Sequence, residues 1–297
     1  MKKQLASLVW LVKSGLSALL VMLACGLATA RFGDGLPLPS TQTRDTTLVT
    51  FDRYVHQPVP DVILVGSSMA FRLKEEYFAT PRLRNLAIAG GSPVTGLAIV
   101  ASRSALPKLV LVETNVMSRA IDEALVTTYS AGSKGRSSFL RPVKTLIAAY
   151  ENWLHAQPSR AQLAQAFSDL LRQPPSNFDN RVYVDRALQQ MNSENPAAVS
   201  TPNVKALEKL VDVLEQRGAH VLLFEMPYSE ELEGSRYATV TRKLVHGAFP
   251  DAGHWLTLDF VRDDLRWADG VHVDERSGLI VARAIDHAIA PYLAASR

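Results

Sequence analysis

The stretch DVILVGSSMAF, residues Asp61 to Phe71, decides the fold. It begins as an apolar, mostly β-branched run and ends abruptly on Gly66, Ser67 and Ser68. Short apolar runs bounded by turn residues are typical of strands buried on both faces of a parallel sheet. A serine at such a strand end either caps the following helix or acts as a nucleophile at the mouth of the sheet. The rest of the sequence has to distinguish these two roles.

Similar apolar runs recur along the chain and alternate with segments of helical periodicity. Strands are predicted at residues 61–66, 83–88, 108–113, 220–226 and 254–259. Helices are predicted at residues 71–79, 93–105, 202–217, 233–247 and 274–290. Strands that alternate with helices predict an α/β fold, here a three-layer α/β/α sandwich with a central parallel sheet.

The alternation stops between Val116 and about Asn203, where helical periodicity continues without a convincing strand. The segments VKTLIAAYENWL (143–154) and AQLAQAFSDLL (161–171) each place their apolar side chains on one helical stripe. We therefore predict a helical insertion at about 116–203, within a single domain that spans residues 61–297.

The first 30 residues have the pattern of a signal sequence or membrane anchor. Lys2 and Lys3 come first, and residues 14–30 then form an uncharged run of 17 residues, close to the roughly 17–25 needed to span a bilayer. Positive charge before the run predicts that the following domain is exported. Because residues 28–30 (Ala-Thr-Ala) also suit a signal peptidase, the domain is either anchored in the inner membrane facing the periplasm or secreted after cleavage. Residues 31–60, rich in proline, threonine and aspartate, predict a linker.

Composition excludes several function classes. A formal net charge of +3, scattered along the chain, argues against a nucleic-acid partner. The sequence has no CxxC pair, no His/Cys cluster and no glycine-rich phosphate loop, so we expect neither a metal nor a nucleotide cofactor. The single cysteine, Cys25, excludes an internal disulfide.

Residues that can carry chemistry follow the predicted strands. In an open parallel sheet, ligands bind beyond the carboxyl ends of the strands, so residues in these positions are brought together. The residues concerned are Ser67 and Ser68 after the first strand, Gly90 and Gly91 after the second, Asn115 after the third, and Asp269 and His272 before the last helix.

This set resembles the SGNH (GDSL-type) hydrolases over roughly residues 61–292. VGSSMAF matches the nucleophile block of that family, NLAIAGG its second block, VLVETN its third, and DGVHVDERSG its Asp-x-x-His block. There are two departures, because Ser67 stands where the family has an aspartate and Thr114 stands where it has a glycine. A Gly-Ser-Ser start behind a membrane anchor is similar to the membrane-bound members that handle acyl groups on cell-envelope polymers.

The resemblance assigns roles to individual residues. It places the catalytic serine on Ser68, with Asp269 and His272 completing the catalytic set. It places the oxyanion donors on Ser68, Gly90 and Asn115, with Gly91 as an alternative to Gly90. These roles agree with the chemistry of the side chains. A serine hydroxyl needs a neighbouring base, a histidine has a suitable ordinary pKa, and an aspartate fixes the histidine tautomer.

We therefore expect an exported serine acyl-transfer enzyme, either an O-acyltransferase or an esterase. Its expected substrate is an acyl ester, favoured as acetyl, of a cell-envelope polysaccharide, and it needs no metal or organic cofactor. The resemblance also implies a membrane-bound acyltransferase as a partner. The alternative is a non-catalytic subunit of an envelope polysaccharide complex that uses the same cleft only for binding.

Each residue taken alone has a simpler interpretation. A serine after a strand is most often a helix cap, while asparagine, aspartate and histidine near glycine are common in turns. Asp251 and His254 repeat the Asp-x-x-His spacing but precede a predicted strand instead of following one. It is the joint occurrence at four strand ends that favours the catalytic interpretation over the simpler one.

Overall fold

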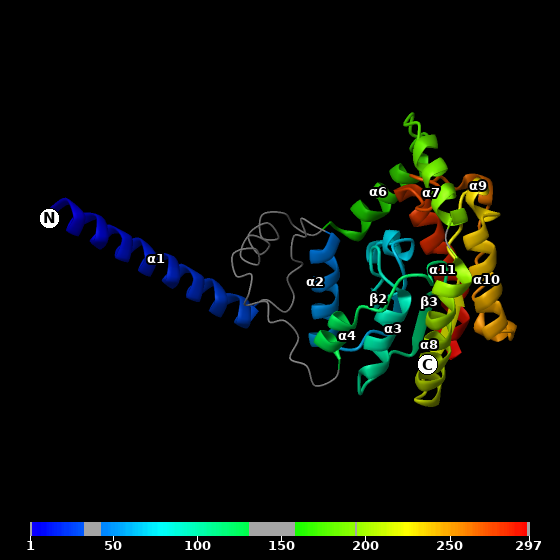
Figure 1. The fold of residues 1–297 in the computed structure, drawn as a ribbon, viewed down its shortest axis with the longest axis horizontal. Coiled ribbons are helices and arrows are strands. Elements are labelled where there is room, and N and C mark those ends of the chain that lie inside the picture. Colours follow the sequence, from blue (N-terminus) through cyan, green and yellow to red (C-terminus); the bar gives the residue numbers. More distant parts are fainter. Residues whose placement is uncertain (1, 33–42, 131–157, 194, 296–297) are drawn as a thin grey trace. The chain divides into compact units, whose positions relative to one another are not determined.

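The computed structural model describes residues 2–32, 43–130, 158–193 and 195–295 (Figure 1). The chain divides into two compact units. One comprises Met1–Gln57 with Lys134–Ser159, and the other comprises Pro58–Ser133 with Arg160–Arg297. The second unit contains the sheet together with Ser68, Asp269 and His272.

A four-stranded parallel sheet forms the centre of the second unit. Its strands are β1 (Val62–Val65), β2 (Leu83–Asn85), β3 (Leu109–Glu113) and β4 (His220–Phe224), in the spatial order β2-β1-β3-β4. Val62 pairs with Leu83 on one side and with Leu109 on the other, and Leu109 pairs in turn with His220. The four strands are the first four predicted from the sequence, and they run parallel as expected.

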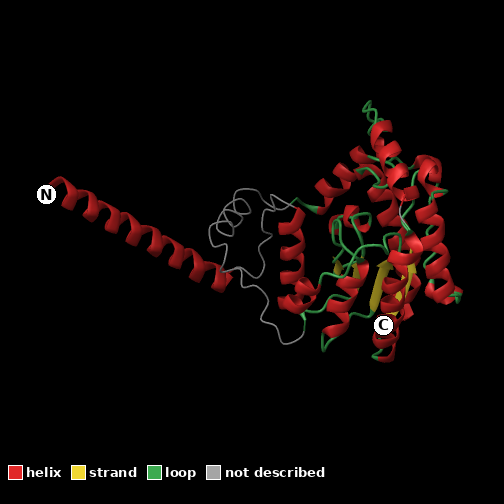
Figure 2. Cartoon of the chain, viewed as in Figure 1, coloured by secondary structure: helices red, strands yellow, loops and turns green. Residues whose placement is uncertain are grey.

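Helices cover both faces of this sheet (Figure 2). On one face, alternate strand residues such as Leu64 and Leu111 share a hydrophobic cluster with Leu279 and Ile285 of α11 (Glu275–Ala295). The other face is covered by α3 (Pro93–Ser102) and α8 (Pro196–Gln216), which contact each other as well as the strands, and α10 (Arg236–Ala248) packs beside α8. The predicted three-layer α/β/α sandwich is therefore confirmed.

The strand order creates a natural binding position. The chain passes from β1 to β2 at one edge and then returns across β1 to β3, so the order reverses between β1 and β3. In open α/β sheets, ligands bind at such a reversal, beyond the carboxyl ends of the strands. The loops that follow β1 and β3, which contain Ser68 and Asn115, start at this position.

The predicted helix at 71–79 is wrong. Its place is taken by two 3₁₀ turns, η2 (Ala70–Arg72) and η3 (Glu75–Tyr77). The side chain of Asn85 donates to the carbonyl oxygens of Ala70 (2.9 Å) and Leu73 (2.7 Å). These two bonds tie the backbone of Ala70 and Leu73 to the end of β2, and the segment forms two separate turns instead of one continuous helix.

The strand predicted at 254–259 does not form. Only one parallel bridge forms there, between Leu223 and Trp255, and Leu256 N donates to Leu223 O at 2.8 Å. The preceding residues form the 3₁₀ turn η5 (Ala252–His254), and the chain turns again at η6 (Arg262–Asp264). The segment therefore runs beside β4 without adding a fifth strand to the sheet.

Within its described part, the segment between β3 and β4 contains helices joined by loops and no strand. It contains α4 (Glu123–Tyr129), α6 (Arg160–Arg172) and α7 (Arg181–Ser193) before α8. The predicted stripe at 161–171 corresponds to α6, whose Phe167 ring lies edge-on to the Tyr77 ring at 5.7 Å. The other predicted stripe, at 143–154, lies outside the described residues.

The first unit contains two described helices. Helix α1 (Lys2–Phe32) includes a stretch, Val9–Leu27, that is long and apolar enough to cross a membrane, and an N-terminal signal sequence has the same properties. Helix α2 (Thr43–His56) shows that part of the predicted linker, residues 31–60, is helical. Phe51 and Tyr54 lie one helical turn apart in α2 and are both buried, and burying one helical face can outweigh the weak helix propensity of a threonine-rich segment.

Candidate active site

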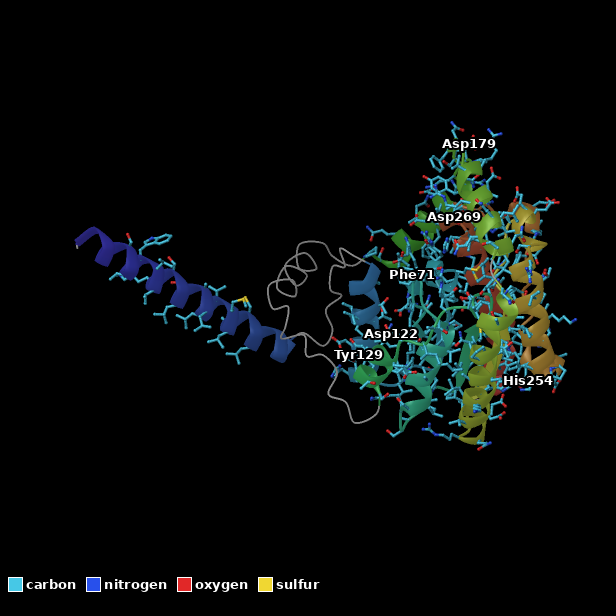
Figure 3. The ribbon with its side chains drawn as sticks, viewed as in Figure 1. Phe71, Asp122, Tyr129, Asp179, His254 and Asp269 are labelled. Carbon is cyan, nitrogen blue, oxygen red and sulfur yellow. The ribbon has the colours of Figure 1, made fainter. Side chains whose placement is uncertain are left out.

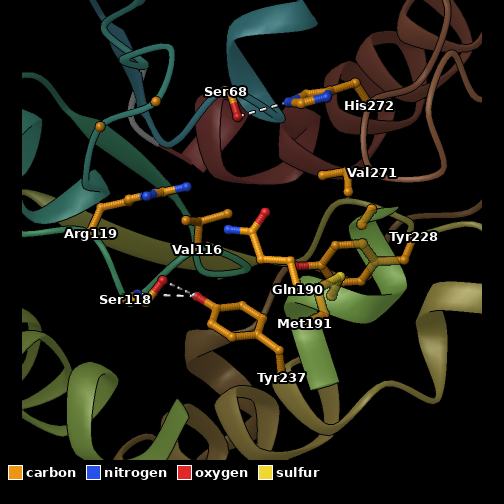
Figure 4. Close-up of a pocket in the computed structure, with 13 residues that line it drawn as sticks. Ser68, Val116, Ser118, Arg119, Gln190, Met191, Tyr228, Tyr237, Val271 and His272 are labelled. Atoms are coloured by element: carbon orange, nitrogen blue, oxygen red, sulfur yellow. Dashed lines mark hydrogen bonds between the residues drawn. The ribbon is translucent and has the colours of Figure 1, made fainter. Parts of the chain in front are cut away.

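Ser68, His272 and Asp269 form a continuous hydrogen-bonded chain. Ser68 Oγ lies 2.8 Å from His272 Nε2, and His272 Nδ1 lies 2.7 Å from Asp269 Oδ2 (Figure 4). Ser68 follows β1, whereas the histidine and the aspartate come from the loop before α11. A hydroxyl, an imidazole and a carboxylate in this order can pass the hydroxyl proton to the ring while the carboxylate holds the ring in place.

A tight turn holds the aspartate against the histidine. Asp269 Oδ1 accepts hydrogen bonds from the backbone N–H groups of Val271 (3.1 Å) and His272 (2.7 Å). Gly270 has a φ of +82°, a conformation that side chains other than glycine rarely adopt. Partial burial tends to raise the pKa of the Asp269 carboxyl, but its bonds to the ring and backbone of His272 outweigh this and leave the pKa below its ordinary value. Asp269 is therefore a carboxylate at neutral pH.

Ser68 and His272 open onto a pocket of about 190 Å³. The loops after β1, β2 and β3 contribute Ser68, Gly90, Gly91, Val116, Ser118 and Arg119 to its lining. The rest of the lining comes from α7, α10 and the loops after β4 and before α11, with Ala187, Gln190, Met191, Tyr228, Tyr237, Val271 and His272. Figure 4 shows Ser68 and His272 on one side of the pocket, with Arg119 and Gln190 pointing into it. This volume is below the roughly 300–1,000 Å³ of pockets that enclose drug-sized ligands, and it suits a short group.

Two backbone N–H groups beside the pocket are candidate donors to an oxyanion. Gly90 adopts a φ of +75°, and a Cβ built on it would meet no atom within 4 Å. Gly91 N donates to Ile88 O at 2.9 Å, so its N–H is already used within the turn. Among the described residues, neither Ser68 N–H nor Gly90 N–H has a protein acceptor. This geometry favours Gly90 over Gly91 as the second donor.

Asn115 is not brought to the pocket. Its side chain is paired with the backbone of Met226, because Asn115 Nδ2 donates to Met226 O (2.8 Å) and Met226 N donates to Asn115 Oδ1 (2.7 Å). The side chain therefore adds two hydrogen bonds between the ends of β3 and β4. It is 5% exposed and lies outside the pocket lining. Of the predicted site residues, Ser68, Gly90, Asp269 and His272 gather around one another or the pocket, whereas Asn115 stays behind it.

Ser67 points away from the pocket and binds a buried glutamate. Ser67 N and Ser67 Oγ both donate to Glu113 Oε2, at 2.7 and 2.6 Å, and Asn115 N donates to Glu113 Oε1 at 2.6 Å. Glu113 is the last residue of β3 and is 0% exposed. Burial raises the pKa of its carboxyl, while the hydrogen bonds from Ser67 and Asn115 oppose that change. One side chain thus ties the turn that carries Ser68 to the end of the neighbouring strand.

Three buried side chains fix the loop that follows β3. Asn203 Nδ2 donates to the carbonyl oxygens of Met117 (2.6 Å) and Arg119 (2.7 Å). The hydroxyl of Tyr237 donates to Ser118 Oγ at 3.0 Å and accepts from Ser118 N at 3.1 Å, as the dashed lines in Figure 4 mark. Tyr228 Oη lies 3.4 Å from Asn115 O. Their side chains come from α8, α10 and the loop after β4, so the loop has a defined shape before any ligand binds.

The second Asp-x-x-His pair has a different environment. His254 Nε2 lies 3.6 Å from Glu215 Oε1, and Asp251 Oδ1 accepts from the backbone of Gly253 instead of from the histidine ring. Figure 3 places His254 far from Asp269, at the other end of the sheet domain. The structure therefore separates this pair from Ser68 and from the pocket.

No protein-family model matches the chain. No curated protein sequence matches it either. Within the described residues, no group of three or more histidine, cysteine, aspartate or glutamate side chains is arranged to hold a metal ion.

Proposed function

We propose that this protein is a serine acyl-transfer enzyme of the SGNH type, an O-acyltransferase or an esterase that acts on a cell-envelope polysaccharide. The observation that carries the proposal is the chain of contacts Ser68 Oγ to His272 Nε2 to Asp269, at 2.8 and 2.7 Å. These three residues come from opposite ends of the domain sequence, and they meet beside a pocket at the reversal of strand order.

The contacts support acylation of Ser68 as the first step. His272 Nε2 takes the hydroxyl proton while Ser68 Oγ forms a bond to the ester carbonyl carbon. The N–H groups of Ser68 and Gly90 then stabilise the negative oxygen of the tetrahedral intermediate. His272 returns the proton to the leaving alcohol oxygen as the ester C–O bond breaks, which leaves an acyl-Ser68 ester. Asp269 stabilises the imidazolium during both proton transfers.

The acceptor in the second step decides between hydrolysis and transfer. Water or a sugar hydroxyl gives its proton to His272 and attacks the acyl-Ser68 ester, and Ser68 leaves as its hydroxyl. Helix α7, which belongs to the segment inserted between β3 and β4, supplies Ala187, Gln190 and Met191 to the pocket. A wall of this kind can shape an acceptor site and limit water, which supports transfer, most simply of an acetyl group because the pocket is small.

The location we propose is outside the cytoplasm, with α1 as an inner-membrane anchor or a cleaved leader. The support is the apolar stretch Val9–Leu27 together with Lys2 and Lys3 in front of it. An export-dependent reporter fused after residue 60 should be active, and activity of a cytoplasm-dependent reporter alone would contradict this location. A membrane-bound acyltransferase that supplies the acyl group remains part of the proposal.

The nucleophile can be identified by covalent labelling of the purified full chain in detergent. A fluorophosphonate should form one adduct, and peptide mass spectrometry should locate it on Ser68. The absence of any adduct on a folded protein would contradict the enzymatic proposal and favour a binding subunit.

The acceptor can be identified by product partitioning. The full chain is supplied with an acetyl-ester donor, with and without envelope polysaccharide, and acetylated sugar is measured against free acetate. Transfer predicts acetylated sugar and a fall in acetate when the polysaccharide is added. Release of acetate that no acceptor changes, with no acetylated sugar, would identify an esterase.

A further inference from the structure

Arg119 places a guanidinium in the pocket that contains Ser68. The residue follows β3 by six positions, it is exposed, and it lines the pocket together with Ser68 and Gly90. Figure 4 shows its side chain reaching into the pocket, on the far side from His272. The acyl-transfer steps described above use neither this side chain nor its charge.

The charge of Arg119 has no counterpart in the pocket. The lining contains no aspartate or glutamate, and Arg119 is its single lysine or arginine within the described part of the chain. The structure also gives the Arg119 side chain no carboxylate partner among the described residues. Some other arginines of the domain do have carboxylate partners, as Arg242 has in both Glu225 (2.7 Å) and Glu233 (2.5 Å). A cation that faces a small pocket without an internal partner favours an anionic ligand.

The backbone that carries Arg119 is held in position. Asn203 binds the Arg119 carbonyl oxygen at 2.7 Å, and Tyr237 binds Ser118 through both its backbone N–H and its hydroxyl. Further along, Asp122 N donates to Thr95 Oγ1 at 3.0 Å. Since both ends of the loop are anchored in the core, the side chain projects from a fixed base, which reduces the entropy lost when a ligand binds.

We propose that Arg119 is a specificity-determining residue that binds a carboxylate of the substrate next to the ester that Ser68 attacks. A guanidinium presents two parallel N–H donors that match a carboxylate, and such charge-assisted pairs are stronger than neutral hydrogen bonds. The preferred substrate is therefore an acidic one, such as an ester of a uronic acid sugar. A carboxylate on the acyl group, as in a half-ester of a dicarboxylic acid, presents the same chemistry.

Two matched pairs of esters distinguish these two sources of the carboxylate. The first pair is O-acetylated methyl glucoside and O-acetylated methyl glucuronoside, in which the carboxylate is on the sugar. The second is 4-nitrophenyl acetate and 4-nitrophenyl hydrogen succinate, in which it is on the acyl group. In the full chain, Arg119→Gln should raise KM for the anionic member of one pair by roughly 10- to 100-fold. It should change kcat/KM for the neutral members by less than about twofold, because they make no charged contact.

Two further variants complete the kinetic test. Arg119→Lys keeps the charge but loses the two parallel N–H donors, so it should retain only part of the selectivity for the anionic ester. Arg283→Gln, which removes an exposed arginine of α11 outside the pocket lining, is the matched control and should behave as the unmodified chain. An equal loss on neutral and anionic esters in Arg119→Gln would overturn the proposal, because it would place Arg119 at the oxyanion or in the folding of the loop. Unchanged selectivity would overturn it as well.

Because the kinetic test rests on the proposed acyl-transfer function, a binding measurement keeps the two proposals separable. In the full-length Ser68→Ala variant, calorimetry compares tetragalacturonate with maltotetraose, and adding Arg119→Gln should weaken binding of the acidic oligosaccharide by tenfold or more. Binding that depends on Arg119 without any esterase activity would reject the enzyme and retain the anion site. Esterase activity with equal binding of both oligosaccharides in either background, and with no effect of Arg119→Gln on the hydrogen succinate ester, would retain the enzyme and reject the anion site.

Discussion

Two adjacent serines at the end of β1 occupy opposite environments. Ser67 is 1% exposed, and its hydroxyl donates to the carboxylate of Glu113, which also accepts from the backbone N–H of Asn115. Ser68 faces the pocket, and its hydroxyl meets His272 at 2.8 Å. The first network joins β1 to β3 inside the core, whereas the second joins β1 to the loop before α11 at the surface.

The Ser67 network is suited to holding a turn in place, whereas the Ser68 network is suited to reacting with a ligand. Every polar atom of the Ser67 network is satisfied by a partner that stays in place, which makes it suited to fixing a turn. The Ser68 network ends in a hydroxyl that borders the pocket, and two backbone N–H groups nearby have no acceptor among the described residues. Under the proposed SGNH assignment, the change from Gly-Asp-Ser to Gly-Ser-Ser affects Ser67, which faces the core, and not Ser68, which faces the pocket.

The largest effect on activity is expected when each of the two serines is replaced by alanine in turn. Ser68→Ala should abolish fluorophosphonate labelling and lower kcat/KM by roughly 10⁴-fold or more, because the nucleophile itself is removed. Ser67→Ala should retain substantial activity while losing about 1–3 kcal/mol of unfolding free energy, because Met69 N and Glu113 lose a buried partner. Labelling kinetics and urea unfolding of each full-length variant give both values. A dead Ser67→Ala enzyme beside an active Ser68→Ala enzyme would reverse the assignment.

A comparable loss is expected when the base is removed. His272→Ala should lower kcat/KM nearly as far as Ser68→Ala does, because residues that act as a unit do not contribute additively. His254→Ala is the matched control, since it belongs to the other Asp-x-x-His pair and lies outside the pocket. Steady-state ester hydrolysis measures both variants. Full activity of His272→Ala combined with loss in His254→Ala would move the site to the second pair.

A change in the buried network of Ser67 and Glu113 should lower the unfolding free energy and, through it, slow the reaction of Ser68. Glu113→Gln replaces one carboxylate oxygen with an NH₂ group, which must face either the N–H of Asn115 or the N–H and hydroxyl of Ser67. We expect a loss of about 1–3 kcal/mol in unfolding free energy and slower labelling of Ser68 in the protein that remains folded. Glu76→Gln, an exposed glutamate of η3, should change neither.

A double-mutant cycle tests whether Ser67 and Glu113 act together. Because they share two hydrogen bonds, the combined Ser67→Ala and Glu113→Gln variant should lose less stability than the sum of the single losses. Strict additivity, measured by urea unfolding of all four chains, would show that the turn is held in some other way.

Local patterns were sufficient to predict the fold class and that Ser68, His272 and Asp269 lie close together. β1, β3 and β4 are short apolar runs next to a glycine or a polar residue, so their positions follow from sequence alone, whereas β2 (Leu83–Asn85) covers only the first half of the predicted run 83–88. Parallel pairing then places the strand ends together. The contacts of Asn115 could not be predicted in this way, because its side chain pairs with the backbone of Met226, 111 residues further on. The same applies to Asn85, whose contacts with Ala70 and Leu73 replace the predicted helix with 3₁₀ turns.

Two missed residues did leave a signal in the sequence. Glu113 ends an otherwise apolar strand, and an acidic side chain in that position must find several donors if it is buried. Arg119 is the first cation after β3, within a loop expected at the binding edge of the sheet. The placement of α7 at the pocket had no such signal, since its helical pattern indicates a stripe but not the surface that the stripe covers.

The smallest effect concerns the acid dependence of stability through Asp269. Its folded-state pKa lies below the ordinary value, mainly because its bonds to His272 outweigh the opposing effect of partial burial. Protonation therefore favours the unfolded chain, so this contribution is complete above the unfolded pKa of about 4 and disappears as the pH falls through the folded pKa. Asp269→Asn removes the contribution at every pH. The difference in unfolding free energy between the unmodified chain and the variant should be below about 1 kcal/mol at pH 6, because the pair is partly open to water, and should shrink toward pH 3. In a His272→Ala background the pH dependence of that difference should be weaker still. Urea unfolding of the four chains between pH 6 and pH 3 measures it, and a difference that grew on acidification would mean that Asp269 is not stabilised by the histidine.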